Sequence, residues 1–212
     1  DYSEAIRLDP KNLPAYSGRG DAYRGKSDFD RAVRDYGKTI ELVGKPEKAH
    51  WTYWLFRGVS YERLGKWPQA EADFLKAMEL DPDQPDVLNQ LGYNWVERNL
   101  KLQEGLALLE KAVTLRPDDG NLLDSLGWAH YRHGDHQAAI KVLERAAALE
   151  PTYSEVRDHL GDAYWRAGRA AEEPDPRHDD HAGHQDRDDR VDRHRSGGVN
   201  QDQSHQDADR CE

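Results

Sequence analysis

Glycine recurs along the first 170 residues of this chain at intervals of 34 to 38 residues, at Gly20, Gly58, Gly92, Gly127 and Gly161. The segments around these glycines, such as "LDSLGWAHYRHG" and "AAIKVLERAAALEP", place apolar residues at positions i, i+3, i+4 and i+7. That spacing is typical of amphipathic helices, which bury one face against a neighbour. Three prolines follow the same interval, at Pro82, Pro117 and Pro151. The period predicts a stack of repeated helix pairs.

The glycines have a packing role in such a stack. Two helices whose axes cross at about 8–10 Å need a small side chain where the axes come closest. The second helix of each pair offers a small residue of its own, at Ala32, Ala70, Gly105 and Ala139. Proline then ends the second helix, because it cannot continue the i→i−4 hydrogen bonding. The sequence therefore predicts an all-α solenoid of antiparallel helix pairs.

At these positions the chain resembles the tetratricopeptide repeat (TPR) family, over nearly all of residues 1–171. The match includes a bulky residue three positions after each glycine, at Tyr23, Tyr61, Trp95, His130 and Tyr164. The resemblance implies a right-handed superhelical solenoid, and the late repeats are most similar to those of bacterial members. The resemblance also divides the array into repeats. It implies a half repeat at 1–12, repeats at about 13–46, 51–84, 85–119 and 120–153, and the first helix of a last repeat at 154–168.

The pattern is irregular in three places. Arg19 and Arg57 occupy a slot that holds leucine in the later repeats. The connection "ELVGKPEKAHWTYW" is longer than the others, which predicts a longer loop or an extended helix. The chain also begins within a repeat, which suggests an excerpt of a longer protein, and its last helix lacks a partner. We therefore expect Leu160 and Tyr164 to be exposed, and the two ends to fray or to self-associate.

The stretch "GDAYRGKS", Gly20 to Ser27, fits the phosphate-binding pattern G-x-x-x-x-G-K-[ST], and it overlaps an Arg-Gly-Asp tripeptide. A phosphate loop needs an apolar strand before it and a helix that begins at its Lys-Ser end. Here the preceding residues belong to a predicted helix, and Lys26 and Ser27 lead into a turn. We interpret both motifs as coincidental.

Charge and composition exclude several classes of partner. The formal net charge of −11 disfavours nucleic acid and anionic lipid. No apolar run approaches the length of a membrane-spanning helix, and the single Cys211 cannot form an internal disulfide. No catalytic or metal-binding motif such as H-E-x-x-H or G-x-S-x-G occurs, and the carboxylates are expected on solvated helix faces. We therefore predict neither an enzyme nor a cofactor.

The segment 172–212 has a different composition. It holds thirteen acidic residues against six arginines, a formal charge of −7, and no Leu, Ile, Phe, Trp, Tyr or Met. Such a segment cannot bury enough apolar surface to offset its conformational entropy, so we expect a disordered acidic tail. Weak metal binding by His178, His181 and His184 is an alternative, and a segment that is not native coding sequence is another.

The family resemblance also implies where a partner would bind. The first helix of each repeat lines the concave wall of the superhelix, and carboxylate, amide and aromatic side chains occupy its inward slots. These candidate groove residues are Asn89, Gln90, Tyr93, Asp124, Ser125, Trp128, Tyr131, Asp158, His159, Asp162 and Trp165. Alternatively, Tyr93 and Trp128 only pack between neighbouring helices.

The slots do not hold the lysine-and-asparagine clamp with which some family members bind acidic chaperone tails. We therefore expect an extended, apolar or basic segment of a partner protein, since aromatics supply contact area and aspartates select cationic groups. The predicted function is a non-catalytic protein–protein interaction scaffold. The alternative is a structural or regulatory module of a longer protein whose activity lies elsewhere. Localisation stays open.

Overall fold

The computed structural model describes residues 1–168, and among these residues it has ten α-helices, one 3₁₀ turn and no β-strand. The elements are α1 (Tyr2–Leu8), α2 (Leu13–Gly25), α3 (Phe29–Val43), η1 (Lys48–His50), α4 (Trp51–Arg63), α5 (Trp67–Leu80), α6 (Pro85–Glu97), α7 (Leu102–Leu115), α8 (Gly120–His133), α9 (His136–Leu149) and α10 (Ser154–Arg166). The predicted all-α fold class is confirmed. The predictions for the segment 172–212 lie outside the described residues.

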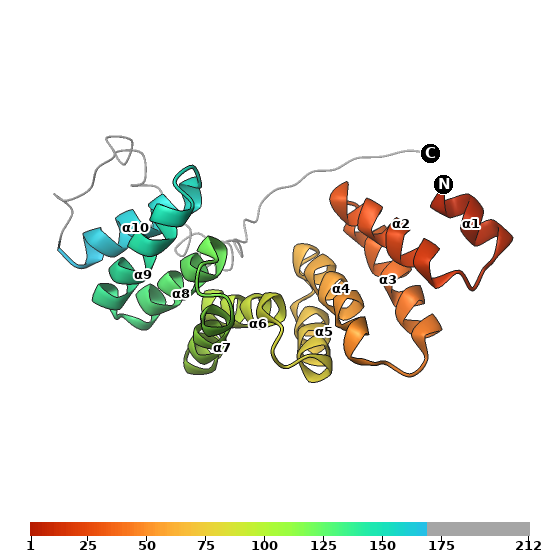
Figure 1. Ribbon diagram of the computed structural model, residues 1–212, viewed down its shortest axis with the longest axis horizontal. Helices are drawn as coiled ribbons and strands as arrows, with labels where there is room; N and C mark the ends of the chain where they lie inside the picture. Colours follow the sequence, from red (N-terminus) through yellow and green to blue (C-terminus); the bar gives the residue numbers. More distant parts are fainter. Residues whose placement is uncertain (169–212) are drawn as a thin grey trace, which may run out of the picture. The chain divides into compact units, whose positions relative to one another are not determined.

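Consecutive helices pack as pairs in chain order: α2 with α3, α4 with α5, α6 with α7, and α8 with α9 (Figure 1). Short connections make the two helices of each pair antiparallel. First helices of neighbouring pairs contact one another at three junctions, α2 with α4, α6 with α8, and α8 with α10, whereas α4 and α6 make no comparable contact in the described part of the chain. Among the described helices, the second helices α3, α5, α7 and α9 make no comparable contact with each other. The first helices therefore line the inner side of the stack.

The recurring glycines lie where the two helices of a pair cross. A Cβ atom added to Gly58 would lie 2.7 Å from the ring of Phe74, and one added to Gly92 would lie 2.9 Å from the carbonyl oxygen of Gly105. At Gly127 an added Cβ would overlap the side chain of Leu143. A larger residue at these positions would force neighbouring atoms to shift, so the small side chains permit the close crossing.

The motif "GDAYRGKS" is part of such a pair. Gly20 lies inside α2, and a Cβ on it would lie 3.0 Å from the ring of Tyr36 on α3. Lys26 and Ser27 follow the helix in the turn before α3. The helical interpretation is confirmed, and this backbone offers no concave loop for phosphate.

Local sequence signals mark where the helices begin and end. The side chains of Asn12, Asp28 and Asp135 each accept a hydrogen bond from a backbone N–H in the first turn of α2, α3 and α9. Gly134 ends α8 with φ 89°, a left-handed conformation that favours glycine.

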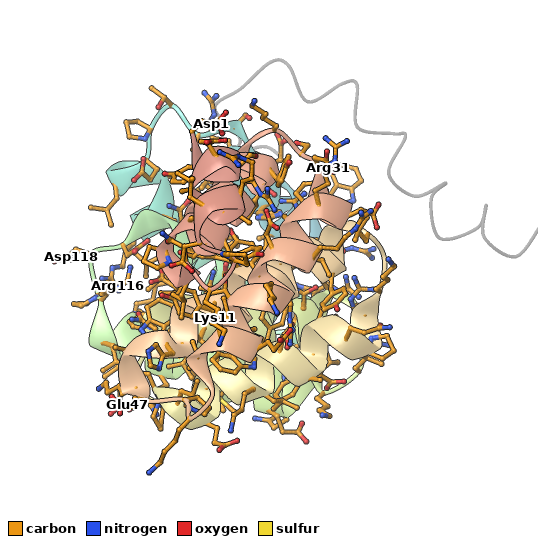
Figure 2. All side chains as sticks on the ribbon, turned by 90° about the vertical axis from the view of Figure 1, so that its right-hand side faces the viewer. Asp1, Lys11, Arg31, Glu47, Arg116 and Asp118 are labelled. Atoms are coloured by element: carbon orange, nitrogen blue, oxygen red, sulfur yellow. The ribbon has the colours of Figure 1, made fainter. Side chains whose placement is uncertain are left out.

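The longer connection predicted before Trp51 is present. It contains Gly44 with φ 65° and the 3₁₀ turn η1, and Lys48 Nζ lies 3.2 Å from Asp81 Oδ1. Figure 2 shows Glu47 of this connection, together with Lys11 of the α1–α2 connection, at the exposed surface. The extra residues therefore lie outside the helix pairs, where they do not disturb the packing.

The irregular arginines form ion pairs within their own repeats. Arg57 Nε and Nη2 lie 2.8 and 2.7 Å from the two carboxylate oxygens of Asp73, and Arg19 binds Asp35 in the same bidentate way. Both carboxylates are buried. The expectation that carboxylates occupy solvated faces is wrong for these residues, because the guanidinium group of the facing helix satisfies them.

The expected exposure of Tyr164 at the last helix is also wrong. The side chain is buried in a cluster with Ala139, Ile140 and Leu143 of α9, and its hydroxyl donates a 2.6 Å hydrogen bond to Glu144. Leu160 is half-buried against the same cluster. Contact with the preceding pair therefore covers the apolar side of α10.

Candidate functional site

Helix α8 lies between α6 and α10 and contacts both (Figure 1). The three first helices bring together aromatic and charged side chains from three successive repeats. We call this surface the inner face, and it consists of Tyr93, Glu97, Asp124, Trp128, Tyr131, Arg132, Glu155, His159, Asp162 and Arg166.

A stack of three rings lies at the centre of the inner face. The ring centroids of Trp128 and His159 are 4.4 Å apart with an interplanar angle of 23°. Tyr131, one turn along α8, stacks on the same indole at 4.9 Å and 17°. Stacked rings at these separations attract each other beyond the area that they bury. The stack therefore joins α8 to α10, and Trp128 and Tyr131 remain half-buried in it.

Polar contacts fix the orientation of the rings. The indole Nε1 of Trp128 donates a 2.8 Å hydrogen bond to Glu97 Oε2 on α6, and Arg132 Nη1 lies 3.4 Å from the same oxygen. On the other side, Arg166 Nε of α10 donates to the hydroxyl of Tyr131 at 3.3 Å. Each aromatic residue of α8 is thus held by a charged residue of a neighbouring repeat, so the surface is formed before any ligand binds.

Asp124 and His159 form the closest polar contact between α8 and α10. Nδ1 of His159 lies 2.9 Å from Asp124 Oδ1, and both side chains are largely buried. Burial alone would lower the pKa of His159, but the hydrogen bond to Asp124 and the nearby carboxylates of Glu155 and Asp162 raise it above its ordinary value. The pair therefore gains stability when the imidazole is protonated.

Negative charge from all three helices converges beside Tyr93. Burial raises the pKa of its phenol, and the carboxylates of Glu97, Glu155 and Asp124 raise it further. The phenol therefore stays neutral. Because these carboxylates belong to α6, α10 and α8, the inner face concentrates acidic groups from separate repeats at one place.

The structure does not bring every predicted groove residue into this cluster. Asn89 and Gln90 are half-buried one turn before Tyr93, and Oδ1 of Asn89 is buried without a hydrogen-bond partner among the described residues. Ser125 is buried. Asp158 and Trp165 are exposed on α10, and Trp165 is 71% exposed. Tyr93, Asp124, Trp128, Tyr131, His159 and Asp162 are brought together.

Sequence reasoning missed the charged residues that hold the rings. Glu97, Arg132 and Arg166 each lie four positions after a predicted groove residue, namely Tyr93, Trp128 and Asp162. Residues at i and i+4 share one face of a helix, so extending the inward slots by one turn identifies all three.

Within residues 1–168, no group of three or more His, Cys, Asp or Glu side chains is arranged to hold a metal ion. No helix in the same part of the chain is long and apolar enough to cross a membrane.

Comparison with known proteins agrees with the repeat geometry. Models described as tetratricopeptide repeat match residues 17–85 and 120–153. The TPR repeat-containing protein PA4667 of Pseudomonas aeruginosa is 37% identical over 78 residues, which are 37% of this chain and 13% of that protein. Residues 17–85 and 120–153 are therefore tetratricopeptide repeats. TPR arrays are in general interaction modules, and the bacterial relative is consistent with a bacterial origin.

Solved TPR structures share the fold. The crystal structure of MamA has a TM-score of 0.62 at 24% identity, and the match covers 76% of this chain and 85% of MamA. YrrB, described as a TPR protein with an unusual peptide-binding site, has a TM-score of 0.62 at 19% identity over 79% of this chain and 84% of YrrB. A chain of the APC/C hetero-tetramer Cut9–Hcn1 has a TM-score of 0.69 at 20% identity, covering 79% of this chain and 32% of that one. At these identities the likeness establishes the superhelical TPR fold.

Proposed function

We propose that this TPR array is a non-catalytic scaffold that binds an extended segment of a partner protein along its inner face. The observation that carries the proposal is the fixed stack of Trp128, Tyr131 and His159. Aromatic side chains supply large contact areas at low entropic cost and dominate the binding energy of protein interfaces. Rings that are already held in place lose little further freedom on binding.

The alternative that Trp128 only packs between helices fits its bond to Glu97 and its contact with His159. It fits less well with the exposure of Trp128, a residue that is half-buried rather than buried. The proposal therefore assigns the indole two tasks: one side stabilises the contact between repeats, and the rest meets the partner. The peptide-binding site that is named for YrrB supports the same kind of use for this fold.

The test uses a random 12-residue peptide library displayed on phage and selected against the full chain. Fluorescein-labelled forms of the selected peptides are then titrated with the wild type, with Trp128→Ala, and with Leu75→Ala as a control on the second helix α5. We expect Trp128→Ala to weaken binding at least about tenfold, as truncation of a central aromatic contact does. We expect Leu75→Ala to leave the affinity unchanged.

Circular dichroism of each variant checks that the helices are intact. Selected peptides that bind Trp128→Ala as tightly as the wild type would place the partner elsewhere and contradict the proposal. Failure to select any peptide would contradict it as well.

A second candidate function is self-association through the ends of the array. Trp165 is 71% exposed, although the corresponding residue of α8, Tyr131, contacts the next first helix. A second copy of the chain could cover the indole. Sedimentation of the wild type and of Trp165→Ser tests this: a concentration-dependent dimer that the substitution abolishes supports it, and a monomer at all concentrations rejects it.

A further inference from the structure

We infer that the partner segment carries basic residues where it meets α8 and α10 and apolar residues where it meets α2 and α4. This inference rests on the proposed function, and it specifies the chemistry and the placement of the ligand. It follows from a difference between the two halves of the first-helix surface.

The C-terminal half has an excess of negative charge. Its inner face holds four carboxylates, Glu97, Asp124, Glu155 and Asp162, against two guanidinium groups, Arg132 and Arg166. Glu97 is engaged by Trp128 and Arg132, and Asp124 by His159.

The other two carboxylates are available to a cation. Glu155 accepts a hydrogen bond from the hydroxyl of Tyr153, and Asp162 attracts Arg166 one turn along α10 without a direct ion pair between them. They flank His159, whose ring is stacked on Trp128. Carboxylates beside flat rings are the surroundings that lysine and arginine side chains favour, since ion pairing and cation–π attraction then act together.

On the N-terminal half of the first-helix surface, acidic and basic side chains offset each other. Asp21 and Arg24 on α2 lie 3.8 Å apart, and Asp21 accepts a 2.7 Å hydrogen bond from the hydroxyl of Tyr36. The guanidinium carbon of Arg24 lies 4.3 Å from the ring centroid of Phe56 on α4. Phe56 and Val59, both half-buried, form the apolar part of this surface. A partner gains more here by burying apolar side chains than by adding charge.

The negative charge of the inner face also disfavours other classes of ligand. An acidic peptide would bring like charges next to Glu155 and Asp162. Nucleic acid is disfavoured for the same reason. A basic segment of a different protein is the occupant that the charges fit.

The peptides selected from the phage library provide the test. We expect an excess of lysine and arginine over the unselected library, and an affinity that falls as salt is added. The double variant Glu155→Lys/Asp162→Lys should bind the labelled peptides about tenfold more weakly or worse. The matched control Glu104→Lys/Glu110→Lys changes the net charge by the same amount on exposed positions of the second helix α7. It should stay within about threefold of the wild type.

Photo-cross-linking tests the placement. A benzophenone at the apolar end of a selected peptide should label α2 or α4, and one at the basic end should label α8 or α10. Should the charge-reversal variant be poorly folded, Glu155→Gln/Asp162→Asn gives the same comparison with a smaller perturbation.

The outcomes separate this inference from the proposed function. Peptides that depend on Trp128 but show no excess of basic residues, or equal binding by the charge variant and its control, would overturn the inference and leave binding at the inner face intact. Cross-links with the two ends exchanged would overturn the placement. Peptides that bind independently of Trp128 would overturn the proposed function itself.

Discussion

The ion pair between Arg57 and Asp73 offers a quantitative test of how the repeats are held together. Its two hydrogen bonds connect α4 to α5, and the side chains of Arg57 and Asp73 are 21% and 7% exposed. The equivalent slots of later repeats are apolar: Leu91 and Leu108 pack in one cluster, and Leu126 and Val142 in another. The array therefore tolerates either an ion pair or two apolar residues at this crossing.

The exposed fractions of the Arg57 and Asp73 side chains determine how much each substitution should lower the free energy of unfolding. Arg57→Leu leaves a nearly buried carboxylate without its cation and should lower the free energy of unfolding by about 3–5 kcal/mol. Asp73→Leu leaves a guanidinium group that still reaches water, so we expect a loss of about 2–3 kcal/mol. The double variant Arg57→Leu/Asp73→Leu should come within about 1 kcal/mol of the wild type or exceed it. Burial raises the pKa of Asp73 even beside Arg57, whereas burial of Arg57 is outweighed by its hydrogen bond and charge attraction to Asp73, which raise the pKa of the guanidinium group; desolvation therefore falls mainly on the carboxylate.

Urea denaturation followed by far-UV circular dichroism measures all four proteins. Both substitutions lie in one helix pair, so a transition that is not two-state affects them alike. The double-mutant cycle gives the coupling between the two residues. A double variant that is as unstable as Arg57→Leu would refute the reasoning, because it would show that this crossing requires the ion pair itself.

Three further predictions concern the packing and titration of the array. Gly127→Ala should lower the free energy of unfolding by about 1–3 kcal/mol, because the added methyl group clashes with Leu143. The control Gly25→Ala has open space around the added atom and should be neutral or stabilising. Equal effects of the two substitutions would contradict the crossing geometry. Gly134→Ala should cost about 1 kcal/mol, because the residue has φ 89°; an unchanged urea midpoint would argue against this helix end. The raised pKa of His159 means that its stabilising contribution is complete below the ordinary value of about 6.5 and fades as the pH rises through the folded value. His159→Gln should therefore destabilise the protein more at about pH 6 than at about pH 9, and a difference that is independent of pH would disprove the role of the Asp124 pair.

The fold could be predicted because one physical requirement recurs in register. Each glycine must lie at a helix crossing, and Gly58, Gly92 and Gly127 do so. The same register placed Asp124, Trp128 and His159 on the first helices, and the structure brings these three side chains into contact; their role in binding stays a prediction.

The ion pairs could not be predicted from the repeat register alone. Arg57 and Asp73 are sixteen residues apart and meet only through the angle at which α4 crosses α5. The same spacing of sixteen residues between Arg19 and Asp35 was a usable signal. Asp124 was expected to face a ligand but pairs with His159, thirty-five residues away. That contact depends on how far one pair is rotated against the next, and no local pattern encodes this rotation.

Nuclear magnetic resonance of the tryptophan indole groups tests most directly whether the inner face binds the partner. The chain has six tryptophans. Trp128 donates its N–H to Glu97 on the inner face, whereas Trp67 lies on the second helix α5 under the guanidinium group of Arg98. Titration with a selected peptide should move the Trp128 indole signal in proportion to occupancy and leave that of Trp67 in place. A Trp67 signal that moves while that of Trp128 stays constant would contradict the account.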